Sequence, residues 1–599
     1  MSGGHSVKTP IHTGDLSDLL SRLWHHLSRR RQRQFGLLLV LMLVSAFAEV
    51  VSLGAVLPFL GILTAPDLVF KQPVVANIAQ AWGISSADQL VLPLTVAFAV
   101  AAIIAGAIRI FLLWVSTRLA YASGADLSIE VYRRTLNQPY RVHVTRNSST
   151  VLSGINKVGG AINVLYQLLI LVSSTVLLAT VMLALIAIDP KVALAATLGF
   201  GTSYVLITWL ARRRLRHNSQ HIAHEQTQAI KALQEGLGGI RDVLLDGTQP
   251  VYCDIYRRAD VSLRRAQGNN VFIAGSPRFA MEALGMVLIA ALAYALSRQP
   301  GGITTALPVL GALALGAQRL LPALQQGYSA WASIAGGHAS LADVIKLLDQ
   351  PLSEEMLLPA PAPLTFQDGI IFNDVRFRYS SEGPWVLDGV NLTIPKGARV
   401  GFVGTTGSGK STALDLLMGL LTPTEGEVLV DGRPIRSNGI RAWQRTVAHV
   451  PQSIYLADAT VAENIAFGVP RGAIDLKRVQ QAARQAQIAD FIESRPEGYN
   501  AFVGERGIRL SGGQRQRIGI ARALYKQANV IVFDEATSAL DNDTERAVMQ
   551  AIESLSDELT VFIVAHRLTT MKNCTQVIEL ADGRIKRSGT YLEIIGSVV

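Results

Sequence analysis

A glycine-rich stretch at residues 404–411 constrains the fold of this chain more than any other feature. It matches the pattern G-x-x-x-x-G-K-[ST], follows an apolar run at 400–403 and precedes a helix-forming run at 412–418. Glycines let backbone N–H groups turn toward a polyphosphate, and the start of a helix adds partial positive charge. The stretch therefore predicts a strand–loop–helix unit that binds nucleotide phosphates within an α/β domain.

Within this loop, individual side chains have distinct expected roles. Lys410 should reach the β- and γ-phosphates, and the Ser411 hydroxyl should hold Mg²⁺. A chance match by a Gly/Ser-rich turn is the alternative, and the flanking strand and helix argue against it. The residues expected to surround the phosphates are Gly404, Thr405, Thr406, Gly407, Ser408, Gly409, Lys410, Ser411 and Thr412.

Two carboxylates follow a second apolar run, at residues 530–533. A continuous apolar run of this length suits a parallel strand that is covered on both faces. Asp534, at the end of that strand, is expected to hold Mg²⁺ through water. Glu535 is placed to activate a water for attack on the γ-phosphate. Tyr379 ends an alternating strand ahead of the loop, where its ring is able to stack on a base.

The first half of the chain consists mainly of long apolar segments. Of the 599 residues, 49% are hydrophobic and only 17% are charged, which is below the norm for globular proteins. Six segments have about the length that a ~30 Å hydrocarbon core requires: about 35–63, 91–121, 164–188, 192–211, 278–296 and 304–324. We predict a cytosolic segment at 1–34, a transmembrane domain at 35–350, a Pro-rich linker at 351–365 and a nucleotide-binding domain at 366–599.

Basic residues flank these segments unevenly. The net charge is +10, and Lys and Arg gather before the first span, between the second and third, and after the fourth. The opposite connections hold only Lys71, Lys191 and Arg298. This positive-inside pattern predicts a multi-pass protein with both termini in the cytosol. A nucleic-acid binder is also basic, but its basic runs would not alternate with apolar spans.

Three connections between spans carry further expectations. The long cytosolic connections, about 122–163 and 212–277, contain segments near 148–156 and 233–241 that are candidates for docking the soluble domain, with a plain exposed loop as the alternative. Between the first two spans, residues 73–82 carry apolar side chains at helical spacing. That short outer helix would lie in the lipid interface or cap the bundle.

Charged residues also lie inside the spans. Such charges are costly in lipid and should face a wet or protein-lined cavity. Arg109, Arg278 and Arg319 come from three different spans, and together they would form a clamp for a polyanion because guanidinium groups match phosphate oxygens. Alternatively, they pair with Glu49 and Glu282 or reach the membrane interface.

The ordered motifs of the C-terminal half resemble those of ATP-binding-cassette proteins. Residues 510–514, including Ser511, Gly512, Gly513 and Gln514, resemble the family signature. Gln452 resembles the Q-loop, residues 503–507 the exporter-type loop, residues 538–541 the D-loop and His566 the switch histidine. With the six preceding spans, the chain is similar to an exporter-type half-transporter, which has an all-α six-helix membrane domain and a C-terminal α/β nucleotide-binding domain.

This resemblance implies a dimer with two ATPs bound head to tail. Each ATP would meet Lys410 of one copy and the signature residues Ser511, Gly512, Gly513 and Gln514 of the other. It implies catalytic roles for Lys410, Gln452, Glu535 and His566, and Mg²⁺ ligands at Ser411, Gln452 and Asp534. A homodimer is the simpler expectation, and a heterodimer is the alternative.

The membrane half resembles the bacterial flippases for lipid-linked oligosaccharides. The similar stretches are 49–59, Ser276-Pro277-Arg278 with Glu282, and 319–322. This implies an ATP hydrolase of the bacterial cytoplasmic (inner) membrane that flips a polyprenyl-diphosphate-linked oligosaccharide, an anionic lipid substrate, to the outer leaflet. The first alternative is export of another amphiphile, such as lipid A, a drug or a peptide. A nucleic-acid-acting cassette ATPase is a different class, which the six spans argue against.

Overall fold

The computed structural model describes residues 15–64, 87–188, 190, 194, 197–297, 302–352, 358–435, 437–535, 540–553, 558–564 and 571–594. The chain divides into two compact units. The first contains Met1–Gln138 and Arg146–Leu352, and the second contains Pro139–Thr145 and Ser353–Val599. The outer helix predicted at 73–82 lies outside the described residues.

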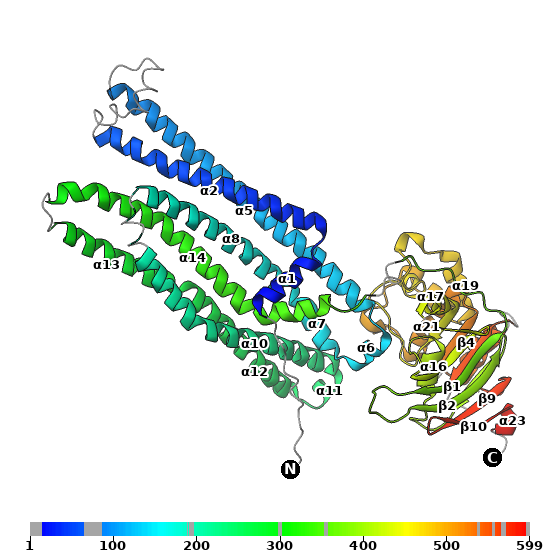
Figure 1. Ribbon diagram of the computed structural model, residues 1–599. Coiled ribbons are helices and arrows are strands. Elements are labelled where there is room, and N and C mark those ends of the chain that lie inside the picture. Colours follow the sequence, from blue (N-terminus) through cyan, green and yellow to red (C-terminus); the bar gives the residue numbers. More distant parts are fainter. Residues whose placement is uncertain are drawn as a thin grey trace, which may run out of the picture. The chain divides into compact units, whose positions relative to one another are not determined.

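The first unit is helical throughout its described part (Figure 1). Each segment predicted to span the membrane falls at least partly on a long helix. The helices are α1 (Leu16–His26), α2 (Arg29–Thr64), α5 (Val91–Leu136), α7 (Ser148–Asn156), α8 (Val158–Ile188), α10 (Thr202–Gly238), α11 (Ile240–Leu245), α12 (Gln249–Gly275), α13 (Pro277–Ser297) and α14 (Gly302–Leu348), with a 3₁₀ turn at Ala87–Leu90 and a π-helical turn at Thr197–Gly201.

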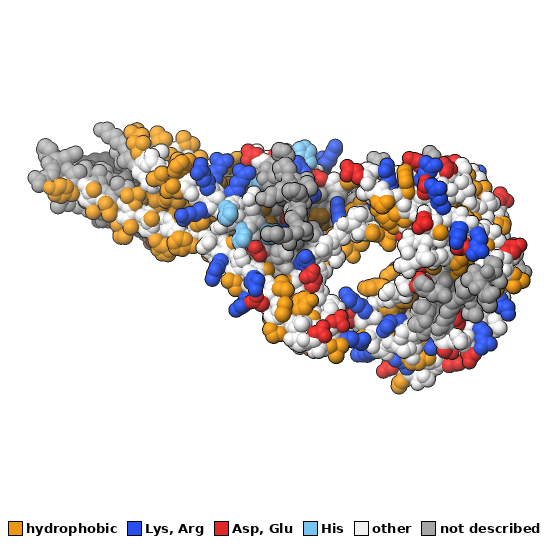
Figure 2. Space-filling view, turned by 90° about the horizontal axis from the view of Figure 1, so that it is seen from below, with side chains coloured by type: hydrophobic (Ala, Val, Ile, Leu, Met, Phe, Trp, Pro, Cys, Tyr) orange, Lys and Arg blue, Asp and Glu red, His pale blue; other side chains and the backbone are white. Residues whose placement is uncertain are grey.

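Several of these helices have the length and surface of membrane spans. Within the described residues, Arg29–Ser52, Val91–Leu136 and Ser148–Leu183 are long and apolar enough to cross a membrane. Leu37, Ile103 and Trp209 are 72%, 71% and 70% exposed, which a bilayer explains and water does not. On the face shown in Figure 2, hydrophobic side chains cover the spans, and basic side chains gather where that cover ends.

Small residues set the spacing between the central helices. A Cβ added at Gly337 of α14 would lie 2.7 Å from the Cγ2 atom of Val164 in α8. One added at Gly124 of α5 would lie 2.3 Å from the Cγ1 atom of Ile162. In lipid, where helix association depends on close packing, glycine at such positions lets the helices approach. The packed group α5, α8 and α14 is therefore fixed by contacts that a methyl group would disrupt.

The second unit is built on two sheets. The larger has the strand order β10-β9-β3-β8-β7-β6. β3 pairs in parallel with β8 and β9, β7 pairs in parallel with β6 and β8, and β10 joins β9 in antiparallel orientation. Its strands are β3 (Arg399–Val403), β6 (Val447–Val450), β7 (Val530–Asp534), β8 (Thr560–Val564), β9 (Gln576–Ala581) and β10 (Arg584–Gly589).

The smaller sheet is antiparallel, with the order β2-β1-β4-β5. Its strands are β1 (Gly369–Phe377), β2 (Leu387–Pro395), β4 (Glu425–Val430) and β5 (Arg433–Pro434). The α-helices of the unit, apart from one that comes from the membrane half, are α16 (Lys410–Leu417), α17 (Ser437–Thr446), α18 (Val461–Ile465), α19 (Leu476–Gln485), α20 (Ala489–Glu493), α21 (Gly512–Lys526), α22 (Asn542–Glu553) and α23 (Tyr591–Ile594). Trp443 is fully buried, and its Nε1 donates to the Leu417 carbonyl at 2.7 Å, which ties α17 to α16.

The remaining helix of this unit is α6 (Tyr140–Thr145), which comes from the connection between the second and third predicted spans. Arg141 Nη2 donates to the Tyr379 carbonyl at 2.5 Å. The structure thus groups 139–145 with the C-terminal unit, and the docking role of 148–156 stays a prediction. The predicted segment forms α7, whose small residues Ser149, Ser153 and Gly154 are buried among the membrane-domain helices. The other candidate, 233–241, spans the end of α10 and the start of α11 in the first unit.

Candidate nucleotide site and membrane cavity

The glycine-rich loop forms the turn between β3 and α16. Gly404, Gly407 and Gly409 have φ values of 148°, 85° and 99°, which favour glycine. Gly409 is the N-cap residue of α16. Lys410 Nζ donates to the carbonyls of Gly404 at 2.8 Å and Thr405 at 2.9 Å, so the ammonium group lies over the loop. A helix N-terminus, positive-φ glycines and a lysine therefore form one anion-binding site.

Four predicted site residues meet at the carboxyl ends of β6 and β7. Asp534 accepts a hydrogen bond from the Ser411 side chain. Glu535 adopts the left-handed region, with φ 52°, and its backbone N–H donates to the Val564 carbonyl at 2.9 Å. Gln452 Nε2 donates to Glu535 Oε2 at 2.6 Å. Left-handed backbone at a residue other than glycine costs energy and tends to occur at functional sites.

The oxygen atoms gathered here fit a hard divalent cation. Burial raises the pKa of Asp534, the adjacent Glu535 raises it further, and Lys410 and Ser411 oppose the shift. A cation would relieve this repulsion between neighbouring carboxylates. The donors are the Ser411 hydroxyl, the Gln452 amide and the Asp534 carboxylate, which are oxygen donors of the type that Mg²⁺ accepts together with phosphates. In the described part of the chain, no group of three or more His, Cys, Asp or Glu side chains is arranged to hold a metal.

Tyr379, which is predicted to stack on a base, is held in place by two neighbouring residues. Its hydroxyl lies 3.2 Å from Thr412 Oγ1, and its ring packs edge-on against Phe377 with centroids 5.0 Å apart. Its carbonyl accepts the Arg141 hydrogen bond from α6. Burial, followed by Asp415 and Tyr379, raises the pKa of Tyr140. Sequence reasoning missed Tyr140 and Arg141 as neighbours of Tyr379, although an aromatic–basic pair after Pro139 was a usable signal.

The signature residues form a second helix N-terminus. Ser511 is the N-cap residue of α21, and its Oγ accepts from the Gln514 N–H at 3.2 Å. The Ser511 N–H donates in turn to Gln514 Oε1 at 2.8 Å. This capping box leaves other N–H groups of the first turn, including those of Gly512 and Gly513, available to an anion. His566 and residues 536–539, which include half of the predicted D-loop, lie outside the described residues.

Inside the membrane domain, α2, α5 and α8 line a cavity of about 600 Å³, to which α14 adds Gln326. Glu49 lies in this wall and is 4% exposed. Arg109 Nη1 lies 3.5 Å from Glu49 Oε2, and the Arg109 side chain is 53% exposed. Hydroxyl groups complete a polar lining within an otherwise apolar bundle, and they belong to Ser45, Ser116, Tyr166, Ser173 and Ser174.

The three arginines predicted to form a clamp are not all brought together. Arg278 Nε pairs with Glu282 Oε1 at 2.8 Å, one turn along α13, and is not among the residues that line the cavity with Arg109. The Arg319 side chain lies outside the described residues. Arg109 and Arg278 thus both form the internal ion pairs that the sequence left open as the alternative.

Asp415 of α16 is a half-buried carboxylate near Asp534 that sequence reasoning missed. Burial, and then Asp534, raise the pKa of Asp415 to about 6. Since the ordinary value is about 4, the folded protein binds this proton more tightly than the unfolded chain. The charged form therefore destabilises the fold above pH 6, and this destabilisation disappears as the pH falls to about 4.

Asp415→Asn is accordingly expected to stabilise the nucleotide-free protein at pH 8 and not at pH 4. The gain should be on the order of 1 kcal/mol, allowing for partial exposure, or ~2–4 °C in unfolding temperature. Thermal unfolding in EDTA across this pH range measures it, with the exposed Asp458 changed to Asn as the control. An equal gain at both pH values would contradict the assignment.

Comparisons with known proteins agree with this architecture. Residues 387–538 match the family described as "ABC transporter", and residues 36–299 match the "ABC transporter transmembrane region". An "ATP-dependent lipid A-core flippase" of Cupriavidus metallidurans is 30% identical over 611 residues, covering 99% of this chain and 97% of the relative. A protein of the same name from Chromohalobacter salexigens is 34% identical over 393 residues, covering 65% of this chain and 67% of that protein.

One solved structure is similar to this chain over nearly its whole length. It is described as a bacterial Atm1-family ABC exporter with ATP bound, and it matches with a TM-score of 0.77 and 25% identity over 95% of this chain and 96% of the other. The helical unit and the α/β unit thus correspond to the transmembrane and ATP-hydrolysing parts of one transporter. The chain therefore belongs to the ATP-binding-cassette transporters, as an ATP-driven half-transporter of the exporter type.

Proposed function

We propose that this exporter is a homodimeric flippase for a phosphate-bearing glycolipid of the bacterial inner membrane. The observation that carries the proposal is the cavity formed by α2, α5 and α8, where a half-exposed Arg109 and several hydroxyl groups lie within an apolar bundle. A sugar-phosphate head group matches that lining, and an acyl or prenyl tail is compatible with lipid. The names of the relatives, lipid A-core flippases, support a lipid cargo.

The proposed cycle assigns work to each part of the nucleotide site. Lys410 and the loop amides hold the phosphates, Ser411, Gln452 and Asp534 hold Mg²⁺, and Glu535 takes a proton from the attacking water. Mg²⁺, when bound, neutralises charge that develops on the phosphates. The signature helix of the second copy contacts the same ATP, so nucleotide joins two domains and hydrolysis releases them. The positive-inside pattern supports a cytosolic position for both termini.

Two cargoes compete within this proposal. The resemblance of the membrane half to oligosaccharide flippases implies a polyprenyl-diphosphate-linked oligosaccharide, whose diphosphate suits guanidinium groups such as that of Arg109. The relatives' names favour a lipid A-type glycolipid, which also carries phosphates. Purified protein in liposomes, loaded with either fluorescent lipid, separates the two cargoes by ATP-dependent loss of accessibility at one leaflet. If neither lipid changes leaflet with ATP, the flippase proposal fails.

The role of Arg109 is tested with its partner Glu49. Arg109→Ala is expected to lower ATP-dependent flipping at least about tenfold, because a charged hydrogen bond to phosphate contributes ~1.5–3 kcal/mol. Glu49→Gln, which keeps the shape but removes the competing carboxylate, should leave flipping intact or raise it. The measurement is initial flipping rate, with ATP hydrolysis in detergent recorded in parallel.

The double variant Glu49→Gln/Arg109→Ala decides between a binding role and a structural one. If Arg109 only neutralises Glu49, removing both charges should restore transport. If Arg109 binds the head group, the double variant should stay as slow as Arg109→Ala. Restored flipping in the double variant would refute the binding role of Arg109, while the ATP-driven export activity of the family would be unaffected.

A further inference from the structure

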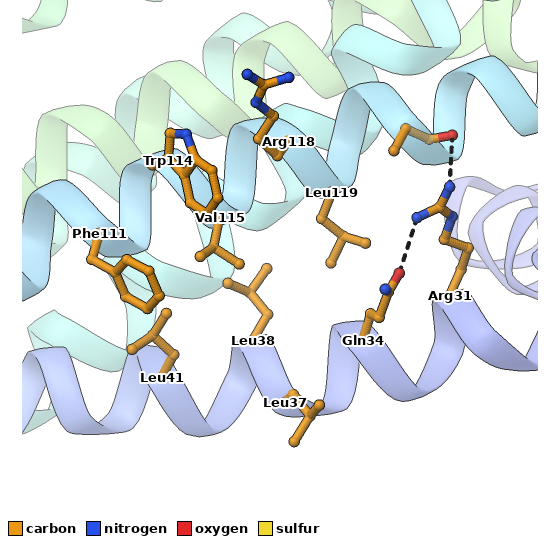
Figure 3. Close-up of a pocket in the computed structure, with 11 residues that line it drawn as sticks. Arg31, Gln34, Leu37, Leu38, Leu41, Phe111, Trp114, Val115, Arg118 and Leu119 are labelled. Carbon is orange, nitrogen blue, oxygen red and sulfur yellow. Dashed lines mark hydrogen bonds between the residues drawn. The ribbon is translucent and has the colours of Figure 1, made fainter.

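A second cavity lies between α2 and α5 and shares no lining residue with the cavity that holds Glu49. Its volume is about 520 Å³, and only α2 and α5 line it (Figure 3). The internal cavity, by contrast, is also lined by α8 and α14. Leu38 and Leu41 of α2 point toward Phe111, Val115 and Leu119 of α5, and form an apolar floor. We refer to this cavity as the α2–α5 groove.

One end of the α2–α5 groove is basic. Arg31 and Gln34 close that end, and Arg118 projects from α5 one turn beyond Trp114 (Figure 3). Arg31 is already engaged, since its Nε donates to Asp126 Oδ2 at 2.8 Å and its Nη1 donates to Gln34 Oε1 at 3.0 Å. Arg118 is exposed and has no hydrogen bond or ion pair with any residue that the structure describes. No acidic side chain is among the described residues that line the groove.

The groove thus combines an apolar channel with an uncompensated guanidinium group. We propose that it binds an acidic phospholipid, with the phosphate on Arg118 near the groove's basic end and one acyl chain along Leu41, Phe111 and Trp114. Phe111 and Arg118 are seven residues apart, or about 10 Å along a helix. A chain that leaves the phosphate therefore passes both aromatic side chains, and the guanidinium fork matches the phosphate oxygens.

The charge of Arg118 favours an acidic phospholipid over a helix of a second copy as the occupant of the groove. Trp114 is 57% exposed and Leu37 is 72% exposed, so the groove needs an apolar cover. An apolar helix would provide the cover but would leave Arg118 buried without a counter-charge, which is costly. An acidic lipid supplies the cover and the counter-charge in one molecule. This lipid-binding site is additional to the flipping activity proposed above. The leaflet in which the site lies depends on the proposed orientation of the chain, but the chemistry of the site does not.

Lipid retention on the full-length purified protein tests the proposal. Native mass spectrometry in detergent, with phosphatidylglycerol or phosphatidylcholine added, counts bound lipid on wild type and on Arg118→Gln. Arg118→Gln is expected to lower phosphatidylglycerol binding about tenfold, the loss expected for one charge-assisted contact, and to leave phosphatidylcholine binding unchanged. Arg118→Lys should retain part of the affinity. The matched control is Arg213→Gln, which removes another exposed arginine, on α10, and should change binding less than twofold.

A fluorescence measurement places the acyl chain. In nanodiscs, the Trp114 signal, taken as wild type minus Trp114→Phe, should be quenched more by brominated phosphatidylglycerol than by brominated phosphatidylcholine. Arg118→Gln should remove that preference. Equal quenching by both lipids would mean ordinary surrounding lipid only, and protection from both would mean that a second copy covers the groove; either result overturns the proposal. Flipping rates do not enter these measurements, so the groove and the transport proposal succeed or fail separately.

Discussion

Glu535→Gln is expected to lower ATP turnover at least about 100-fold while ATP binding stays close to wild type. A positioned general base contributes ~10²–10⁴-fold to a hydrolytic step. Glutamine keeps the size of the side chain and an acceptor oxygen, so the 2.6 Å hydrogen bond from Gln452 Nε2 can persist. The loop, Lys410 and Asp534 are unchanged, so phosphate binding is preserved. Steady-state phosphate release and titration with ATP measure the two quantities.

The same substitution should trap the ATP-bound dimer. If ATP joins the loop of one copy to the signature helix of the other, a variant that binds but does not hydrolyse ATP should accumulate the joined state. Cross-linking or size analysis with and without ATP reports this accumulation. Glu497→Gln, which alters an exposed carboxylate of the same unit, is the control and should turn over ATP at the wild-type rate. Wild-type hydrolysis by Glu535→Gln would refute the base assignment.

Local geometry explains why the nucleotide loop and β7 were predictable from sequence. A strand–loop–helix unit that wraps phosphate needs glycine where φ is positive, and that need is met within eight residues of chain. The run at Val530–Asp534 forms β7 because four consecutive apolar side chains require cover on both faces, and the sheet gives that cover. The side chains that follow the strand then lie at its carboxyl end by chain continuity alone.

Features that depend on packing between distant segments were not predictable. Sequence showed that Arg109 and Glu49 are costly in lipid, but their 3.5 Å approach depends on the register between α2 and α5. Helix α6 belongs to the C-terminal unit and α7 to the membrane unit, because α7 buries its small residues against other membrane helices. Ser153 Oγ, for example, lies 2.9 Å from Thr227 Oγ1 of α10, a contact that no spacing within 148–156 reveals.

A large effect is also expected at Gly404, and Gly407 provides a matched comparison. Both residues have positive φ, at 148° and 85°. A Cβ at Gly404 would lie 2.2 Å from the Leu580 carbonyl oxygen, whereas a Cβ at Gly407 would meet nothing within 4 Å. The close approach follows from sheet register, because β3 pairs with β9 at Val403↔Glu579, one residue before each of the two clashing positions. The oxygen belongs to strand backbone, so it cannot move aside as a flexible side chain would.

Gly404→Ala is therefore expected to destabilise the nucleotide-free protein by about 1–3 kcal/mol more than Gly407→Ala, the usual range for forced overpacking. Both variants place an L side chain at positive φ, and Gly404→Ala adds the clash with the β9 backbone. Because relief of the clash would displace the loop from the sheet, Gly404→Ala should also bind ATP at least about tenfold more weakly than wild type. Unfolding without nucleotide and ATP titration measure the two effects. Equal stability of the variants would mean that the loop can move away from β9 at no cost, and the rigid-loop account of phosphate binding would then be wrong.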